Sequence, residues 1–598
     1  MMSELIVGID LGTTNSEIAV VRQGRVEVIF VTPDSFMLPS VVGLDPANQL
    51  LVGDAARNQY MLHPERTIRS VKRQMGNEVR LNLGVDAFTP QEISAMILRR
   101  LKSVAEAYLG QAVKKAVITV PAFFSDAQRR ATHEAGEIAG LEVVRIINEP
   151  TAAALAYGEA NSPLKKNNGE SLQNRVLVYD LGGGTFDVSV VLIEGDVVEV
   201  LASHGNNHLG GDDFDSKIVD FLVRHLETQG ITTVRSSISA MARLQRAAES
   251  AKIILSNEPF VTISEEYLLE HQGKPVHLNL EFSRQEYEDL IAPYIDETME
   301  AIQTALKEAG LSVRHIDRVL LVGGASRTPC ITERLKYQLG MDVHAEVNPD
   351  LCVAMGAALQ GSIISGDHRA TVLVDVTPYT FGTSSLVPGT FSETCYVPII
   401  HKNTPIPVTK TSVFYTILDQ QKEVEIDIYQ GDSVYLNENL KIGDFIVNGL
   451  SNRPSGNEIL INLTLDLNGI LKVTATEKRT GLQKSITINN AMKAADAGEL
   501  AKVRQRIDEL SGDADRSQRH TPESELTDAD PALQRLKTEV QELMEKAERM
   551  LPEIAAEDAE EMRRMIQALK EHLVLNATAL LQPLMHELAD MIYYLQRN

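Results

Sequence analysis

Residues 178–189 read VYDLGGGTFDVS, in which an apolar run ends in an aspartate, three glycines, a threonine and a second aspartate. A related stretch, VGIDLGTTNS, occupies residues 7–16. Asp10 and Asp180 are separated by about half the length of the region 4–365. Throughout that region, short β-branched runs alternate with amphipathic helical patterns. We therefore predict an α/β region of two related halves, each contributing one strand and turn to a shared cleft.

The two glycine motifs suit a nucleotide polyphosphate. Glycines let backbone N–H groups approach phosphate oxygens, and Thr13, Thr14 and Thr185 add hydroxyl donors. Aspartates beside a phosphate would repel it unless they hold a hydrated Mg²⁺. One glycine-rich turn alone is most often a tight turn between strands, but two related ones in one region favour a phosphate site. The sequence contains no P-loop motif, and no G-x-G-x-x-G after a strand, which disfavours a dinucleotide site.

Two further clusters fit the same ligand. The stretch LLVGGASRTP (320–329) ends a strand in two glycines and supplies Arg327, whose planar guanidinium can stack on a base. In RAAESAKIILS (246–256), Glu249, Lys252 and Ser256 share one helical face. Taken alone, that face is more simply a solvated charge pair.

The pattern of residues in the sequence changes twice after the α/β region. From about 376 to 490, short alternating strands separated by Gly, Asn and Pro predict an antiparallel β domain with the spacing of a sandwich. From about 491, patterns rich in Ala, Glu, Leu and Lys predict helices, interrupted by the polar segment 511–531. The segment 160–175 is predicted to be a surface loop. The apolar run HRATVLVDVTP (368–378) joins the first two regions and has no obvious place in either core.

Composition narrows the class of protein. A net charge of −25 opposes broad attraction to nucleic acid or to an anionic membrane. Cys330, Cys352 and Cys395 form neither a disulfide framework nor a zinc pattern, which favours a reducing compartment. The sequence shows no apolar run long enough to span a membrane and no signal-peptide pattern. We expect a cytoplasmic protein without nucleic-acid or membrane partners.

Several long motifs in the sequence resemble those of a known protein family. GIDLGTTNS, AVITVPAFFSDAQRRAT, RIINEPTAAALAYG, VYDLGGGTFDVS, HLGGDDFD, LVGGASRTP and VNPDLCVAMGAALQG occur in this order, and the chain resembles the heat-shock ATPase chaperones of the DnaK type, the heat shock protein 70 family. The resemblance implies a multidomain fold: an actin-like (ribonuclease H-like) α/β ATPase domain (1–367), a linker (368–376), an antiparallel β-sandwich that binds peptide (377–490), and an α-helical lid (491–598).

The resemblance also implies roles for residues at the ATP site. Asp10 and Asp187 would hold the water shell of Mg²⁺, with K⁺ as a further ion. Lys72 would stabilise charge on the γ-phosphate, while Glu149 and Asp180 would orient the attacking or metal-bound water, with Thr185 close to the γ-phosphate. The residues implied to bind ATP or ADP are Gly12, Thr13, Thr14, Asn15, Gly182, Gly183, Gly184, Thr185, Gly210, Gly211, Asp212, Glu249, Lys252, Ser256, Gly323, Gly324, Arg327 and Asp350.

Two further sets of residues follow from the resemblance. The residues that would relay the nucleotide state to the β domain are Pro121, Arg129, Val372, Leu373 and Val374. Those that would contact an extended apolar peptide are Phe414, Val424 and Ile426 on the cleft floor and Leu386 and Ile417 near its rim. A J-domain co-chaperone and a nucleotide exchange factor are the implied partners besides unfolded polypeptide clients.

The chain also departs from the pattern of the general bacterial chaperone. The segment 77–88 is much shorter, which trims one peripheral subdomain and is closer in character to the HscC-type branch. Ala370 and Thr371 stand where the linker commonly has Asp-Val. An ATP-gated peptide chaperone is the expected function. The alternatives are a nucleotide-sensing adaptor that holds one dedicated partner, which the altered linker would suit, and a small-molecule kinase, which would leave the β domain without a role.

Overall fold

The computed structural model describes residues 5–160, 173–341, 343, 348–367, 371–387, 390, 393–487 and 497–511, with isolated positions after residue 540. Contacts divide the chain into two units, Met1–Val31 with Phe36–Leu510, and Thr32–Ser35 with Ser511–Asn598. The elements described below belong to the first unit. The predicted loop 160–175, the polar segment 511–531 and the helical patterns after it lie almost entirely outside the described residues.

The first lobe is built on a mixed sheet in which the first glycine motif follows an inner strand. The strand order is β11–β10–β1–β2–β3, with β4 beside β2; β1 runs parallel to β10 and antiparallel to β2. The strands are β1 (Ile6–Asp10), β2 (Asn15–Arg22), β3 (Arg25–Val28), β4 (Leu38–Pro39), β10 (Lys115–Val120) and β11 (Glu142–Asn148). The helices of this lobe are α2 (Pro90–Leu109), α3 (Asp126–Ile138), α4 (Glu149–Ala160) and α9 (Cys352–Ser365).

Two glycines let the helices of the first lobe approach closely. A Cβ on Gly8 of β1 would come within 2.0 Å of the backbone nitrogen of Ala358, so α9 lies directly on the strand. A Cβ on Gly356 would come within 1.8 Å of the Ala152 carbonyl oxygen, where α9 crosses α4. These contacts fix α4, and therefore Glu149 at its first position, relative to β1.

A smaller layer lies beside the first sheet. It consists of β5 (Val42–Leu44), β6 (Leu50–Val52), β7 (Thr67–Ile68), α1 (Asp54–Gln59) and the 3-10 helices η1 (Pro64–Arg66) and η2 (Val71–Gln74). The short segment 77–88 forms the two-stranded hairpin β8 (Leu81–Leu83) and β9 (Asp86–Phe88).

The second lobe repeats the strand pattern of the first. Its sheet has the order β17–β12–β13–β14–β18–β21, with β12 antiparallel to β13 and parallel to β17. Three antiparallel strands with a parallel neighbour beside the first therefore occur in both lobes, as the paired motifs predict. The strands are β12 (Gln173–Leu181), β13 (Phe186–Glu194), β14 (Val197–Asn206), β17 (Arg318–Val322), β18 (Val372–Val376) and β21 (Pro405–Ile406).

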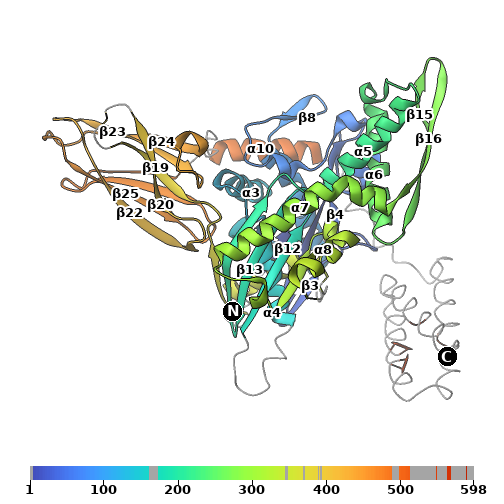
Figure 1. Cartoon of the computed structure of the whole chain (residues 1–598), viewed down its shortest axis with the longest axis horizontal. Helices are drawn as coiled ribbons and strands as arrows, with labels where there is room; N and C mark the ends of the chain where they lie inside the picture. The colour runs from blue at the N-terminus through green and yellow to red at the C-terminus, as the bar shows by residue number, and fades with distance from the viewer. Residues whose placement is uncertain are drawn as a thin grey trace. The chain divides into compact units, whose positions relative to one another are not determined.

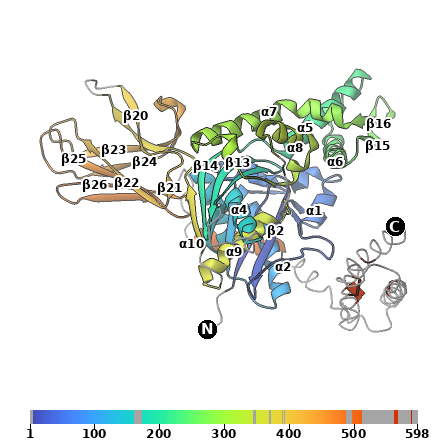
Figure 2. The same ribbon diagram turned by 60° about the horizontal axis from the view of Figure 1, so that its bottom comes forward.

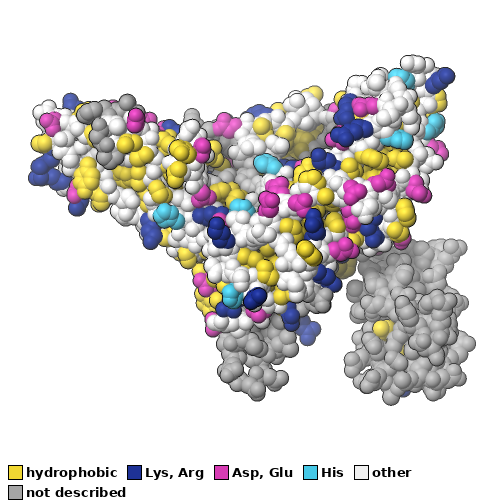
Figure 3. Space-filling model, viewed as in Figure 1, with side chains coloured by type: hydrophobic (Ala, Val, Ile, Leu, Met, Phe, Trp, Pro, Cys, Tyr) yellow, Lys and Arg dark blue, Asp and Glu magenta, His cyan; other side chains and the backbone are white. Residues whose placement is uncertain are grey.

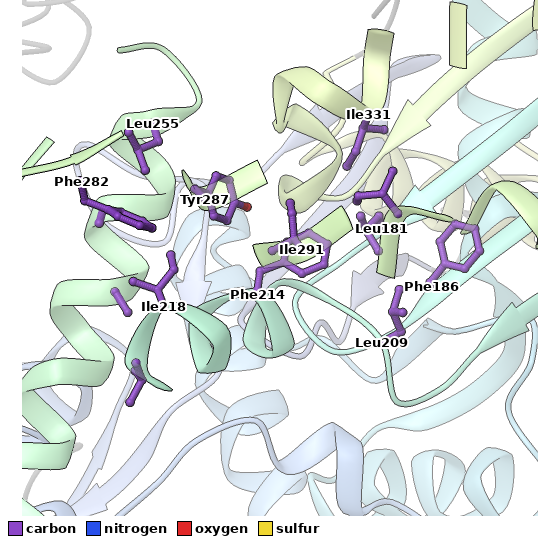
Figure 4. Close-up of a cluster of buried hydrophobic side chains, with 14 of the residues drawn as sticks. Leu181, Phe186, Leu209, Phe214, Ile218, Leu255, Phe282, Tyr287, Ile291 and Ile331 are labelled. Atoms are coloured by element: carbon purple, nitrogen blue, oxygen red, sulfur yellow. The ribbon is translucent and has the colours of Figure 1, made fainter. Parts of the chain in front are cut away.

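Helices and a long hairpin complete the second lobe around one buried core. They are α5 (Gly211–Thr228), α6 (Ile238–Leu255), α7 (Arg284–Glu308), α8 (Pro329–Leu339), and the hairpin β15 (Phe260–His271) and β16 (Lys274–Ser283); the minor elements are η4 (Val234–Ser236), η5 (Val313–His315) and η6 (Gly324–Arg327). Figure 4 shows Phe214, Phe282, Tyr287 and Ile291 converging in this core, each fully buried. Burial of side chains of this size contributes about 1.5–3 kcal/mol each.

The apolar run that had no obvious place in the sequence becomes a strand of the second lobe. Residues Val372–Val376 form β18, which pairs in parallel with β14 through Val197↔Val372, Val198↔Leu373 and Glu199↔Val374. Leu373 and Val376 pack against the core formed with α4 and α9. The linker is thus bound to the sheet edge by main-chain hydrogen bonds and by apolar side chains.

The region after the linker is a β-sandwich, as predicted (Figures 1 and 2). One sheet has the order β20–β19–β23–β24 and the other β22–β25–β26–β27. The strands are β19 (Phe381–Leu386), β20 (Thr394–Ile400), β22 (Val408–Tyr415), β23 (Glu423–Gln430), β24 (Leu440–Asn448), β25 (Glu458–Leu465), β26 (Leu471–Glu477) and β27 (Gln483–Thr487), with η7 (Leu436–Glu438) before β24. The core between the sheets includes Ile428, Leu463 and Val473, all fully buried.

The helix α10 (Ala497–Ser511) packs on the first lobe. Ile507 is fully buried in the core of that lobe, and Arg506 pairs with Glu92 at 2.6 Å while its guanidinium lies over the Phe88 ring. Asp508 is ion-paired with Arg99 of α2. The start of the predicted helical tail is therefore anchored to the first lobe.

Candidate functional site

A cavity of about 340 Å³ lies between the two lobes, where the two glycine motifs meet. Both turns, the C-terminal half of α6, η6 and the first residue of α4 contribute to its walls. The predicted residues that line it are Asp10, Gly12, Thr13, Thr14, Asn15, Lys72, Glu149, Asp180, Gly182, Gly183, Thr185, Gly211, Glu249, Lys252, Ser256, Gly323, Gly324, Arg327 and Asp350. The structure thus brings together residues from most of the length of the α/β region.

The two glycine turns are in direct contact. A Cβ on Gly183 would lie 1.9 Å from the Thr14 hydroxyl oxygen, so only glycine permits this approach. The Gly182 N–H donates to the Thr185 carbonyl at 3.1 Å and closes the second turn. Backbone groups and threonine hydroxyls therefore face one space, as a phosphate cradle requires.

Four predicted residues lie beside the cavity without lining it. Gly184 and Gly210 pack behind the second turn, where a Cβ on Gly210 would come within 2.5 Å of the Gly184 nitrogen. The Asp212 N–H donates to the Gly183 carbonyl at 2.7 Å, and the Asp212 side chain accepts from Ser70 at 2.6 Å. Asp187 accepts hydrogen bonds from the Ala122 and Phe123 N–H groups, both at 3.1 Å.

A buried ion pair sits on the first-lobe wall of the cavity. Lys72 in η2 and Glu149 at the start of α4 are both buried, with Nζ and Oε1 2.5 Å apart. Burial raises the pKa of Glu149 to about 7, against the lowering effect of Lys72. Burial alone would lower the pKa of Lys72, but the carboxylates of Glu149 and Asp10 outweigh it and raise that pKa. The ammonium group is therefore held charged at the cavity wall.

The aspartates of the two motifs are close to one another and strongly influenced by burial. Asp10 accepts a hydrogen bond from the Thr119 hydroxyl at 2.9 Å, which orients its carboxylate. Burial raises the pKa of Asp10, and that of Asp180 well above its usual range, with Glu149 and Asp187 raising the latter further. Burial raises the pKa of Asp187 to about 6. Such an acidic, partly desolvated group of carboxylates is stabilised by a bound cation.

The α6 face also faces the cavity, so the interpretation of it as a solvated charge pair is wrong. Lys252 Nζ lies 2.8 Å from Asp215 Oδ1, and both side chains are largely buried. Glu249 is bound by Arg69 of the first lobe at 2.9 Å. On the opposite wall, Arg327 pairs with Asp350 at 2.6 Å.

Sequence reasoning missed several residues that line the cavity, namely Glu17, Met37, Ile253, Val322, Ala325, Thr328, Pro349 and Val353. Most are apolar or small and carry no signal that separates them from ordinary core. Glu17 is different, because it is a charged residue directly before the apolar run Ile18–Val21 and directly after the first glycine motif. That position was visible in the sequence.

One of the residues predicted to relay the nucleotide state, Arg129, is connected to the linker through Asn148. Pro121 follows β10, and Arg129 of α3 donates to the Ala122 carbonyl at 2.9 Å and to Asn148 Oδ1 at 2.7 Å. Asn148 in turn donates to Asp375 of β18 at 2.8 Å. The β domain also contacts the first lobe, because the Leu471 N–H donates to Asp126 at 2.9 Å.

The residues predicted to contact peptide are divided between the surface and the core of the sandwich. Ile426 is buried in the core, Phe414 and Val424 are partly buried at its margin, and Leu386 lies at the end of β19. Ile417 follows β22 and is 49% exposed. Hydrophobic side chains also gather on the face of the β domain seen in Figure 3.

Two related α/β lobes with a glycine-lined acidic cavity between them, joined by a docked linker to a β-sandwich, define the fold of a two-lobed ATPase of the actin-like class followed by a β domain. The family model described as "Hsp70 protein" matches residues 6–597. The chain is 45% identical over 506 residues to the "Chaperone protein DnaK" of Thermotoga petrophila and to that of Thermotoga maritima, covering 82% of this chain and 82% of each relative. The chain belongs to the Hsp70 family.

No helix among the described residues is long and apolar enough to cross a membrane.

Proposed function

We propose that the cavity binds ATP or ADP with Mg²⁺, that the chain hydrolyses ATP, and that the nucleotide state controls the binding of extended apolar peptide by the sandwich. Members of the Hsp70 family are ATP-dependent chaperones, and the described residues of this chain include a cavity between two lobes, a linker strand and a β-sandwich, which such a cycle would use. The main support for the proposal is that Asn148 and Glu149 are neighbours in the sequence. Glu149 pairs with Lys72 in the cavity, and Asn148 donates to the linker residue Asp375.

The residues around the cavity suit Mg²⁺ bound through water. The donors are oxygens of Asp10 and Asp187, which a hard cation prefers. Among the residues that the structure describes, no three His, Cys, Asp or Glu side chains converge as in a cage made of protein alone. Phosphate and water oxygens would therefore complete the coordination, and the ion would neutralise phosphate charge.

The chain's own residues would catalyse hydrolysis by position and charge. Lys72 would stabilise negative charge on the γ-phosphate, and Glu149 and Asp180 would orient the attacking water. Thr13, Thr14 and Thr185, with the glycine backbone, would hold the phosphates, while Glu249, Lys252, Ser256, Gly324 and Arg327 would surround the adenosine. Such preorganised groups are the main source of rate enhancement in phosphoryl transfer.

In the β domain, Leu386, Phe414, Ile417, Val424 and Ile426 would form the peptide site. An extended peptide beside a sandwich edge gains main-chain hydrogen bonds, and apolar pockets select its side chains. We further propose that a J-domain protein stimulates hydrolysis and that the chain functions in the cytoplasm. An exchange factor would have to accommodate the short β8–β9 hairpin.

Peptide release tests this proposal. A fluorescent extended apolar peptide is bound to the full chain in ADP, and its dissociation is followed by anisotropy after addition of Mg-ATP, Mg-ADP or buffer. We expect ATP to accelerate release at least about tenfold, a coupling free energy within the usual allosteric range. Equal release in all three conditions would contradict the proposal.

A further inference from the structure

Glu17 places a carboxylate in a strand whose other central residues are completely buried. It belongs to β2, is only 3% exposed, and lines the cavity between the lobes. Its neighbours Ser16, Ile18, Ala19 and Val20 are completely buried. A residue with a purely structural role here would be apolar or hydrogen-bonded, because burying an unpaired carboxylate costs several kcal/mol.

The strand register places Glu17 beside Asp10. The two residues are direct partners in the antiparallel β1–β2 ladder, so their side chains are on the same face of the sheet. Thr119 orients the Asp10 carboxylate by a hydrogen bond at 2.9 Å. Two ionised carboxylates directly opposite each other destabilise a ladder, and a cation bound between them would relieve the repulsion.

Among the described residues, no cationic side chain is paired with Glu17. No hydrogen bond or ion pair there reaches its carboxylate, and Lys72, which lines the same cavity, is paired with Glu149 at 2.5 Å. The cavity therefore contains a buried carboxylate without a partner that faces the space where the phosphates would be bound.

A hard cation would meet this need. Mg²⁺ takes carboxylate and water oxygens and keeps part of its water shell, so a second carboxylate near Asp10 can accept hydrogen bonds from metal-bound water. Since no three acidic, His or Cys groups among the described residues are placed to hold a metal ion by themselves, the remaining ligands must come from nucleotide and water. The cation and the nucleotide would then bind together.

We propose that Glu17, together with Asp10, holds through water the cation that enters with the nucleotide, and so sets the cation requirement of nucleotide binding. This inference rests on the proposed nucleotide site and adds to it a residue that the family motifs do not assign. Glu17 is a positioning residue in this account, because it acts through the ion.

The test measures nucleotide binding and does not depend on ATP hydrolysis. A fluorescent ADP analogue is titrated into the full chain at a series of free Mg²⁺ concentrations, for the wild type, Glu17→Gln and Glu27→Gln. Glu27 lies on the neighbouring strand β3 outside the cavity and controls for loss of a glutamate charge. We expect Glu17→Gln to raise the half-saturating Mg²⁺ at least about tenfold, as loss of outer-sphere partners does, and Glu27→Gln to leave it unchanged.

A second readout reports the ion directly. The EPR signal of free Mn²⁺ is followed during titration of the ADP complex, and Glu17→Gln should weaken Mn²⁺ binding by a similar factor, with Glu17→Asp falling between it and the wild type. An unchanged Mg²⁺ requirement overturns the inference. So does tighter ADP binding by Glu17→Gln at every Mg²⁺ concentration, because the carboxylate would then only repel phosphate. If the wild type binds no ADP at any Mg²⁺ concentration, the proposed function itself fails.

Discussion

Asn148 Nδ2 donates to Asp375 Oδ2 at 2.8 Å, which joins the end of β11 to the linker strand β18. Both side chains are buried, and Asp375 also accepts from the Thr151 hydroxyl at 3.2 Å. The residue after Asn148 is Glu149, which is paired with Lys72 in the cavity. A shift of the β11–α4 junction in response to nucleotide would therefore change the contacts of the linker directly.

Removing the Asn148 amide should uncouple the domains. In Asn148→Ala the buried Asp375 loses a donor and Arg129 loses an acceptor, while the cavity lining is intact. We expect stimulation of ATP hydrolysis by an apolar peptide to fall at least about fivefold, within the usual range of allosteric coupling. Basal hydrolysis and ADP affinity, measured alongside, should stay within about twofold of wild type. Full peptide stimulation in the variant would show that the signal takes another route.

Docking of the linker depends on the side chains on one face of β18. Leu373 packs against the core formed with α4 and α9, whereas its neighbour Val372 is 54% exposed. An aspartate at Leu373 would bury a charge, so Leu373→Asp should release the strand, and Val372→Asp should not. Limited proteolysis in ATP, with the cut mapped by mass spectrometry, should show cleavage at 371–376 at least about tenfold faster in Leu373→Asp, since exposure of the strand follows its docking free energy. Equal cleavage of the two variants would exclude this role for Leu373.

The pair Arg69–Glu249 closes the cavity across the two lobes. Arg69 Nη2 and Glu249 Oε2 are 2.9 Å apart, and both side chains are largely buried. The Arg69 guanidinium also lies over the Tyr60 ring. An ion pair of this kind is worth about 1 kcal/mol, so Arg69→Ala should accelerate ADP release about fivefold. Stopped-flow chase of a fluorescent ADP measures it, and Arg57→Ala, which removes an exposed pair with Asp54 in the same layer, is the matched control. An identical release rate in both variants would contradict the closing role.

The β-sandwich should depend on pH through Glu477. Burial would raise the pKa of this carboxylate, but hydrogen bonds from Ser451, Thr480 and Asn457 lower it to about 2. Because the folded pKa lies below the ordinary value, the stabilisation is complete above pH 4.5 and is lost as the pH falls toward 2. Glu477→Gln should destabilise the sandwich by about 2 kcal/mol at pH 7 and by much less near pH 2.

Hydrogen exchange of the β25 and β26 amides in the full chain, corrected for the intrinsic rate at each pH, measures this difference. A loss of protection that is the same at pH 2 and pH 7 would mean that Glu477 acts by shape alone.

The sequence predicts the architecture well because the decisive signals are local. The turns at 10–14 and 180–185 need glycine, and the alternation of strands from 376 to 490 follows the period of a half-buried sheet. The linker was harder, since Val372–Val376 finds its partner strand β14 far away in the sequence. The face of Glu249, Lys252 and Ser256 looked solvated because the groups it meets, Arg69 and Asp215, lie on other elements.

Glu17 shows a second limit of prediction from the sequence. Its charge was evident, but only the register Asp10↔Glu17 and the position of the cavity give it meaning. The ligand roles of the cavity residues stay predictions, because they concern a molecule that must still be bound.

Single-turnover hydrolysis of ATP by the full chain and by Lys72→Ala, each with and without an extended apolar peptide, tests the central claim most directly. Wild-type hydrolysis should be slow and should accelerate with peptide. Lys72→Ala should bind ATP but lose at least about a hundredfold in rate, because charge on the γ-phosphate is no longer stabilised. Normal hydrolysis by Lys72→Ala would mean that the phosphates bind elsewhere, and a wild-type rate that ignores peptide would mean that cavity and sandwich are not coupled.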